Sequence, residues 1–144
     1  MNNLILKIED EFADDSDLST ALSNGLWFTE APEGTKPPYG VFFIISNSPV
    51  YTLAGIKEQY KVQFNIFSNA RGAQEIAHNF TKLKAVYDQL AFDYLTLGDE
   101  EDLGDGALLN EKHYEFIREF DGLLRPDGMV WQWTVQYRVE VYFS

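Results

Sequence analysis

The chain has no cysteine among its 144 residues. This absence excludes a disulfide scaffold, thiolate zinc sites and cysteine nucleophiles. A domain of this length buries roughly 68–70% of its unfolded surface, so it needs neither a disulfide nor a structural metal to hold a core. We therefore predict a single domain, residues 1–144, held together by apolar packing.

Basic residues are scarce, because 11 Lys and Arg stand against 23 Asp and Glu, for a formal net charge of −12. A protein that binds duplex nucleic acid needs a basic face to displace counterions, so this class is disfavoured. The plain interpretation of the charge is solubility through self-repulsion. A second interpretation, which composition leaves open, is a surface that must not adhere to DNA or to an anionic partner.

Long apolar runs are also missing. No stretch approaches the roughly 20 residues of a membrane-spanning helix, so no membrane partner is expected. The first twelve residues, MNNLILKIEDEF, hold a short apolar run followed by acids, and this order is not that of a signal peptide.

The motifs of the common enzyme classes are absent as well. The sequence has no phosphate-binding glycine loop and no GxSxG nucleophile turn. His78 and His113 lack the spacing of a metal pair. The acidic segment DEEDLGDG does not fit a calcium-binding EF-hand loop. Counted from Asp99, it places Leu103 where that loop needs an oxygen ligand and Asn110 where it needs a bidentate acid. Nothing isolates two carboxylates in an apolar setting that would shift a pKa. We expect no enzyme activity, no catalytic residues, no metal and no cofactor.

The clearest positive signal is the end of the chain, residues 129–144, MVWQWTVQYRVEVYFS. Large apolar and aromatic residues occupy every second position, and mostly polar ones lie between them. A period of two places each set on one face of a β-strand. The pattern predicts a half-buried antiparallel strand whose polar face is wet in a monomer, or lines a channel or meets a neighbour in an assembly.

Two helices and three further strands are predicted before it. Residues 2–22 favour a helix interrupted near Asp14 to Asp17, and residues 70–92 favour a long helix with an apolar stripe from Ile76 to Leu90. Predicted strands lie at residues 39–46, covered on both faces, and at residues 57–67 and 112–120, with a polar connection at residues 47–55 and an RPDG turn at residues 125–128. The order is α-β-β-α-β-β. It predicts an α+β fold, a mostly antiparallel sheet of four or more strands covered by the long helix.

Four residues are candidates for a subunit interface. Trp27, Phe28 and Tyr39 flank a proline-rich loop, residues 31–38, and aromatic side chains beside such a loop suit a protein interface. The alternative is that they belong to the core. Arg118 lies among apolar strand positions, and it either pairs with a nearby acid at the sheet edge or serves an interface.

The order of these features resembles the tail completion proteins of long-tailed bacteriophages, also called tail-to-head joining or tail terminator proteins. The features that carry the resemblance are the N-terminal helix followed by GLWFTEAPEGTKPPYGVFFI, the strand EQYKVQFNIFS leading into NARGAQEIAHNFTKLKAVYDQL, the strand HYEFIREF, the RPDG turn and the terminal YRVEVYFS. They cover nearly the whole chain, but they are a pattern of architecture rather than a catalytic motif.

The resemblance implies a structural subunit of the virion tail or neck, assembled in the host cytoplasm, that caps the tail tube and joins it to the head. Its implied partners are other copies in a six-membered ring, the tail tube protein and the head-neck connector proteins. Genomic DNA passes through such a ring without specific binding. The competing hypotheses are another neck or minor tail component, such as a head-closure protein, and a small enzyme or ligand-binding domain.

Overall fold

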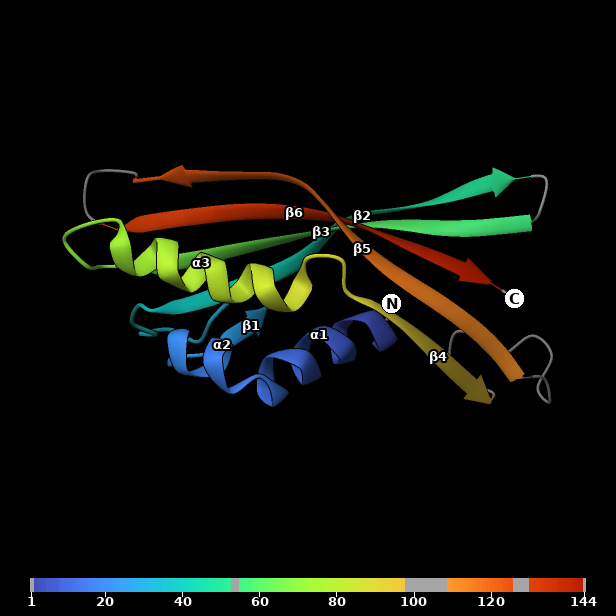
Figure 1. Cartoon of the computed structure of the whole chain (residues 1–144), viewed down its shortest axis with the longest axis horizontal. Coiled ribbons are helices and arrows are strands. Elements are labelled where there is room, and N and C mark those ends of the chain that lie inside the picture. The colour runs from blue at the N-terminus through green and yellow to red at the C-terminus, as the bar shows by residue number, and fades with distance from the viewer. Residues whose placement is uncertain (1, 53–54, 98–108, 126–129, 144) are drawn as a thin grey trace.

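The computed structural model describes residues 2–52, 55–97, 109–125 and 130–143 (Figure 1). Three helices and six strands follow in the order α1 (Asn2–Asp14), α2 (Ser16–Ala21), β1 (Leu26–Phe28), β2 (Tyr39–Thr52), β3 (Gly55–Ser68), α3 (Gln74–Tyr87), β4 (Ala91–Leu97), β5 (Leu109–Leu124) and β6 (Trp131–Phe143). No helix among the described residues is both long and apolar enough to cross a membrane.

All six strands form one sheet in the spatial order β1-β2-β3-β6-β5-β4. The short edge strand β1 runs parallel to β2, with Leu26 opposite Gly40, whereas all other neighbours are antiparallel. The sheet is strongly twisted. The three helices lie on one of its sides and under one end, while β2 and β3, and separately β4 and β5, extend beyond them and diverge (Figure 1).

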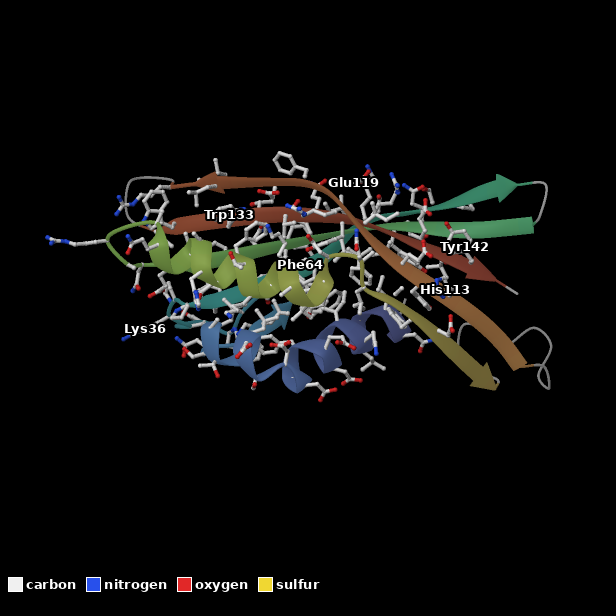
Figure 2. The ribbon with its side chains drawn as sticks, viewed as in Figure 1. Lys36, Phe64, His113, Glu119, Trp133 and Tyr142 are labelled. Carbon is white, nitrogen blue, oxygen red and sulfur yellow. The ribbon has the colours of Figure 1, made fainter. Side chains whose placement is uncertain are left out.

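The core fills the space between the helices and the sheet. Alternate residues of β3 and β6 point toward the helices and are almost fully buried, from Tyr60 to Ile66 and from Val135 to Val141. From α3, Ile76, Phe80, Leu83 and Tyr87 meet them, and the Phe80 and Trp133 rings stack at 4.5 Å. Figure 2 labels Phe64 and Trp133 within this layer. The apolar stripe of α3 therefore packs against the aromatic face of β6.

The predicted fold class is wrong. The molecule is mostly sheet, with all six strands in one sheet, and the parallel β1–β2 pair makes that sheet mixed. The order is α-α-β-β-β-α-β-β-β, not α-β-β-α-β-β. The helices cover only part of one face, so the description of a sheet covered by a long helix does not hold (Figure 1).

Local differences explain this error. The helix predicted over residues 70–92 ends at Tyr87, because Asp88 is extended and Gln89 takes a positive φ of 58°. Of the remaining predicted residues, Ala91 and Phe92 instead begin the edge strand β4. The polar connection predicted at residues 47–55 instead continues β2 to Thr52 and begins β3 at Gly55.

Other details fall closer to the predictions. The N-terminal helix is interrupted at Asp15, whose side chain caps α2 by accepting a hydrogen bond from the Leu18 backbone N–H at 2.8 Å. The last two strands are antiparallel neighbours. The acidic segment at residues 98–108 and most of the RPDG turn lie outside the described residues.

Candidate assembly surface

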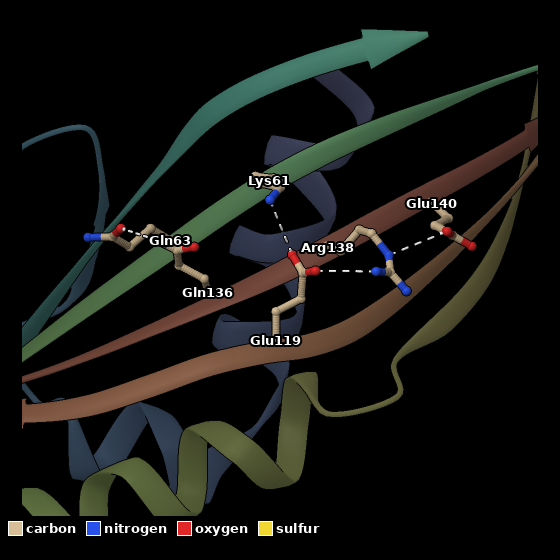
Figure 3. A network of polar contacts seen from close by, with 6 residues as sticks. All are labelled: Lys61, Gln63, Glu119, Gln136, Arg138 and Glu140. Atoms are coloured by element: carbon tan, nitrogen blue, oxygen red, sulfur yellow. Dashed lines mark hydrogen bonds and ion pairs between the residues drawn. The ribbon is translucent and has the colours of Figure 1, made fainter. Parts of the chain in front are cut away.

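The side of the sheet away from the helices is polar where β3, β6 and β5 run side by side. We call it the polar face, defined by Lys61, Gln63 and Asn65 of β3, Thr134, Gln136, Arg138 and Glu140 of β6, and Glu119 of β5 (Figure 3). The alternation of the strands forces these residues together, since their neighbours fill the core.

Ion pairs hold one half of the polar face. Glu119 sits at a register shift in β5, between Arg118 and Phe120, and this bulge turns its carboxylate over β6. One Glu119 oxygen lies 3.2 Å from Arg138 Nη1 and the other 3.7 Å from Lys61 Nζ. Arg138 Nε also lies 3.4 Å from Glu140 (Figure 3). The charges of two cations and two carboxylates therefore nearly cancel in this half of the polar face.

Uncharged side chains hold the other half. Gln136 donates to Gln63 at 3.0 Å, Gln63 donates to Asn65 at 3.0 Å, and Thr134 donates to the same Asn65 oxygen at 2.9 Å. The chain of hydrogen bonds crosses from β6 to β3, so this half of the face is ordered without net charge.

Exposed apolar side chains lie along one margin of this face. Phe120 is 55% exposed and stands opposite Gln136, and Leu124 is 54% exposed and stands opposite Gln132. The bulge at Glu119 shifts the register and sends Phe120 away from the core, although sequence alternation grouped it with the buried Tyr114 and Phe116. The sequence does not indicate this bulge, and it therefore does not predict the exposed apolar margin.

His113 binds two carboxylates at the far end of β5. Its Nδ1 contacts Asp93 of β4, and its Nε2 lies 3.1 Å from Glu115. The hydrogen bond to Asp93 is the main reason that the imidazole pKa is raised, and the bond to Glu115 adds to it. The neighbouring Tyr142 hydroxyl donates to Glu140, which raises the phenol pKa to about 12. Both ring nitrogens face acceptors, so the geometry favours the imidazolium form.

The four predicted interface residues do not form one site. Phe28 packs toward the core against Phe42, with ring centroids 5.2 Å apart. Trp27 is 37% exposed, and Tyr39 stacks on Phe67 at 4.8 Å beside the loop that follows β1. Arg118 is on β5, with β3 and β6 between it and the others. Trp27 and Tyr39 share a region, whereas Phe28 and Arg118 do not join them.

Arg118 forms ion pairs with two nearby carboxylates, which was one of the two roles predicted for it; the other, at a subunit interface, stays a prediction. Its Nε lies 3.2 Å from Asp88, at the end of α3, and its Nη1 lies 2.8 Å from Asp121. Asp88 also accepts the Tyr137 hydroxyl hydrogen bond at 2.7 Å. These contacts connect the helix end to β5 and β6.

Among the described residues, a group of acidic side chains lies away from the polar face. Exposed Glu9, Asp10, Asp14 and Asp17 lie on α1 and α2, on the helix side of the sheet. The polar face itself is close to neutral. Within the described ranges, no group of three or more His, Asp or Glu side chains is placed to hold a metal ion.

No protein-family model matches the chain, and no curated protein matches its sequence. The chain is similar to a solved structure described as the virion of a native gene transfer agent particle, with a TM-score of 0.68 and 9% sequence identity. The match covers 92% of this chain and 89% of the other. At this identity the likeness establishes a shared fold, and the fold is one that occurs in a virion chain.

Proposed function

We propose that the chain is a structural subunit of a phage-like particle. The observation that carries the proposal is the fold shared with a gene transfer agent virion chain across nearly the whole length of both. The polar face supports it, because its side chains are ordered by one another rather than arranged around a reactive group. We propose no enzyme activity and no cofactor.

Within that class we propose a tail completion subunit. It forms a ring, expected to have six members, that caps the tail tube protein and joins it to the connector proteins of the head. The sequence resemblance supports this finer role. The sheet supports it too, because β2 beyond Phe42 and the outer side of β4 offer backbone hydrogen-bonding groups to a neighbouring subunit.

The positions of the charged residues affect whether such a ring binds the DNA that passes through it. The strongly acidic surface is on α1 and α2, and the polar face is nearly balanced. A channel lined by the polar face would present neutral amides and paired charges, with no cationic surface free to hold DNA. The exposed acids of α1 and α2 would then keep the assembled ring soluble rather than line the channel.

Assembly in solution tests the proposed ring. We expect light scattering at rising protein concentration to show a transition to a single larger species, and negative-stain microscopy of that species to show rings with a central hole. A matched pair of variants sharpens the experiment. Gln63→Lys with Gln136→Lys places two unpaired cations on the polar face, and Lys82→Gln with Lys84→Gln alters charge on α3 only.

Placement within the particle is tested by mixing the purified chain with tails and, separately, with heads. Binding to tail ends supports the tail completion role, and binding to heads alone supports a head-closure role instead. A strictly monomeric protein that binds neither would overturn the proposal.

A further inference from the structure

Trp27 is exposed but fixed in place. The indole Nε1–H donates to the Asn24 carbonyl at 2.9 Å. One face of the ring lies against Gly25, where a Cβ atom would stand only 2.8 Å from indole Cε2. Gly25 adopts a φ of 104°, a conformation that glycine takes without strain. The chain thus presents a large aromatic surface, 37% exposed, in one orientation.

The loop after β1 is fixed in the same way. The Asn24 side-chain amide donates to the Lys36 carbonyl at 2.7 Å, and the Asn24 backbone N–H donates to Pro38 at 3.1 Å. Within the loop, the Thr35 hydroxyl donates to the Pro32 carbonyl at 2.6 Å. A loop with these internal bonds loses little freedom when a partner binds.

This loop and Trp27 together line a surface hollow. Its walls are Trp27, Glu30, Ala31, Pro32 and Glu33. Both glutamates are exposed, and neither forms an ion pair with a cation among the described residues. Lys36 belongs to the same loop but does not line the hollow. A hollow lined by an aromatic ring, two carboxylates and apolar side chains is an environment that a cationic side chain prefers.

We propose that this hollow binds a lysine or arginine side chain of a different protein of the particle. The cation lies over the Trp27 ring, and Glu30 and Glu33 flank it. Charge complementarity selects a basic segment. A different protein supplies such a segment more readily than a second copy of this chain, in which 11 Lys and Arg stand against 23 Asp and Glu. The inference adds the chemistry of one contact to the proposed function, and it is tested without assembly, so that either idea can fail alone.

Short peptides provide the probe. The Trp27 indole N–H signal, assigned with Trp27→Phe in a ¹H–¹⁵N spectrum, is followed while acetyl-Gly-Arg-Gly-amide is added. A second titration uses the same peptide with citrulline, which keeps the shape of arginine without its charge. We expect the arginine peptide to shift the Trp27 signal with millimolar saturation, and the citrulline peptide to bind at least about fivefold more weakly.

Matched variants locate the interaction. Glu30→Gln with Glu33→Gln is expected to weaken arginine-peptide binding by about fivefold, whereas Glu9→Gln with Asp10→Asn removes the same charge from α1 and leaves binding unchanged. Far-UV circular dichroism checks that both proteins are folded. Equal shifts with both peptides, equal binding by both double variants, or self-association that only the Glu30/Glu33 variant loses would overturn the proposal.

Discussion

At the scale of single residues, buried polar bonds determine where the helices meet the sheet. The Tyr137 hydroxyl reaches Asp88 at the end of α3, and the Tyr87 hydroxyl donates to the Ile8 carbonyl of α1 at 2.7 Å. Burial is the first cause that raises the pKa of each phenol, so both remain neutral donors across the ordinary pH range. Each bond satisfies a polar group that would be costly to leave unpaired.

Replacing Tyr137 with phenylalanine removes one of these bonds and keeps the ring. We expect the free energy of unfolding to fall by about 1–2 kcal/mol, because a hydrogen bond to a charged group is lost while Asp88 keeps Arg118. Urea unfolding measures the change. Tyr39→Phe is the control, since its ring stacks on Phe67 in the same way with or without the hydroxyl. Equal stability of the two variants would contradict the role assigned to Asp88.

His113 makes stability depend on pH. Asp93 and Glu115 raise the imidazole pKa above its usual 6.5, so the contribution is complete below that unfolded-state value and is lost as pH rises through the higher folded-state value. The nearby Glu140 and Tyr142 of β6 also face this end of the sheet. We expect His113→Gln to lower the free energy of unfolding relative to wild type. This difference should be larger at pH 6 than at pH 9.

Nuclear magnetic resonance titration of the imidazole checks the cause. Asp93→Asn should lower the pKa of His113, because it removes the first of the two carboxylates. An unchanged pKa in this variant, or a stability difference that is the same at both pH values, would rule out the pairing as the origin.

At the scale of elements, β1, β3 and the C-terminal cap of α2 pack tightly around Gly40 of β2. A Cβ atom there would lie 2.9 Å from Leu26 Cδ1, 3.2 Å from Ile66 Cγ2 and 3.3 Å from Leu22 Cδ1. These atoms are all in the buried core, where little space is left for adjustment. The parallel pairing of β1 therefore depends on a missing side chain.

Gly40→Ala should destabilise the protein by about 1–3 kcal/mol, the cost of overpacking a tight core. Gly72→Ala is the matched control, since a Cβ there meets nothing within 4 Å, and its expected effect is close to zero or slightly stabilising. Thermal or urea unfolding of both variants gives the comparison. A neutral Gly40→Ala would mean that β1 packs less closely than described.

The sequence predicted those elements whose period is carried by large side chains. The stripe of Ile76, Phe80, Leu83 and Tyr87 and the alternation of β3 and β6 each bury one face, so pattern and structure agree. The pattern failed past Tyr87, because Leu90 continues the helical spacing while the backbone turns at Gln89. It also failed for β1, whose three residues are too few to show a period.

The candidate surface was predictable only in part. Alternation in β6 predicted a polar face, and the structure has one. Two residues of that face, Lys61 and Glu119, lie on other strands. Glu119 reaches β6 only because of a bulge in β5 that the sequence does not indicate. The Trp27 hollow depends on Gly25 and on Asn24 contacts across the loop, and such contacts leave no periodic signal.

At the scale of the whole molecule, the two faces differ in character. One face carries the helices (Figure 1), with the exposed acids of α1 and α2. The other carries the near-neutral polar face (Figure 3), with the exposed Phe120 and Leu124 at its margin. The β2–β3 hairpin and the β4–β5 pair extend past the helices (Figure 1). A subunit with unequal faces and open edges suits an ordered assembly.

The most direct test of the account is to polymerise the tail tube protein of the same particle with and without this chain. We predict that added chain halts elongation, and that electron microscopy shows it as a ring at one end of each shortened tube. Tubes of unchanged length, with none of the chain bound at their ends, would contradict the proposed tail completion role.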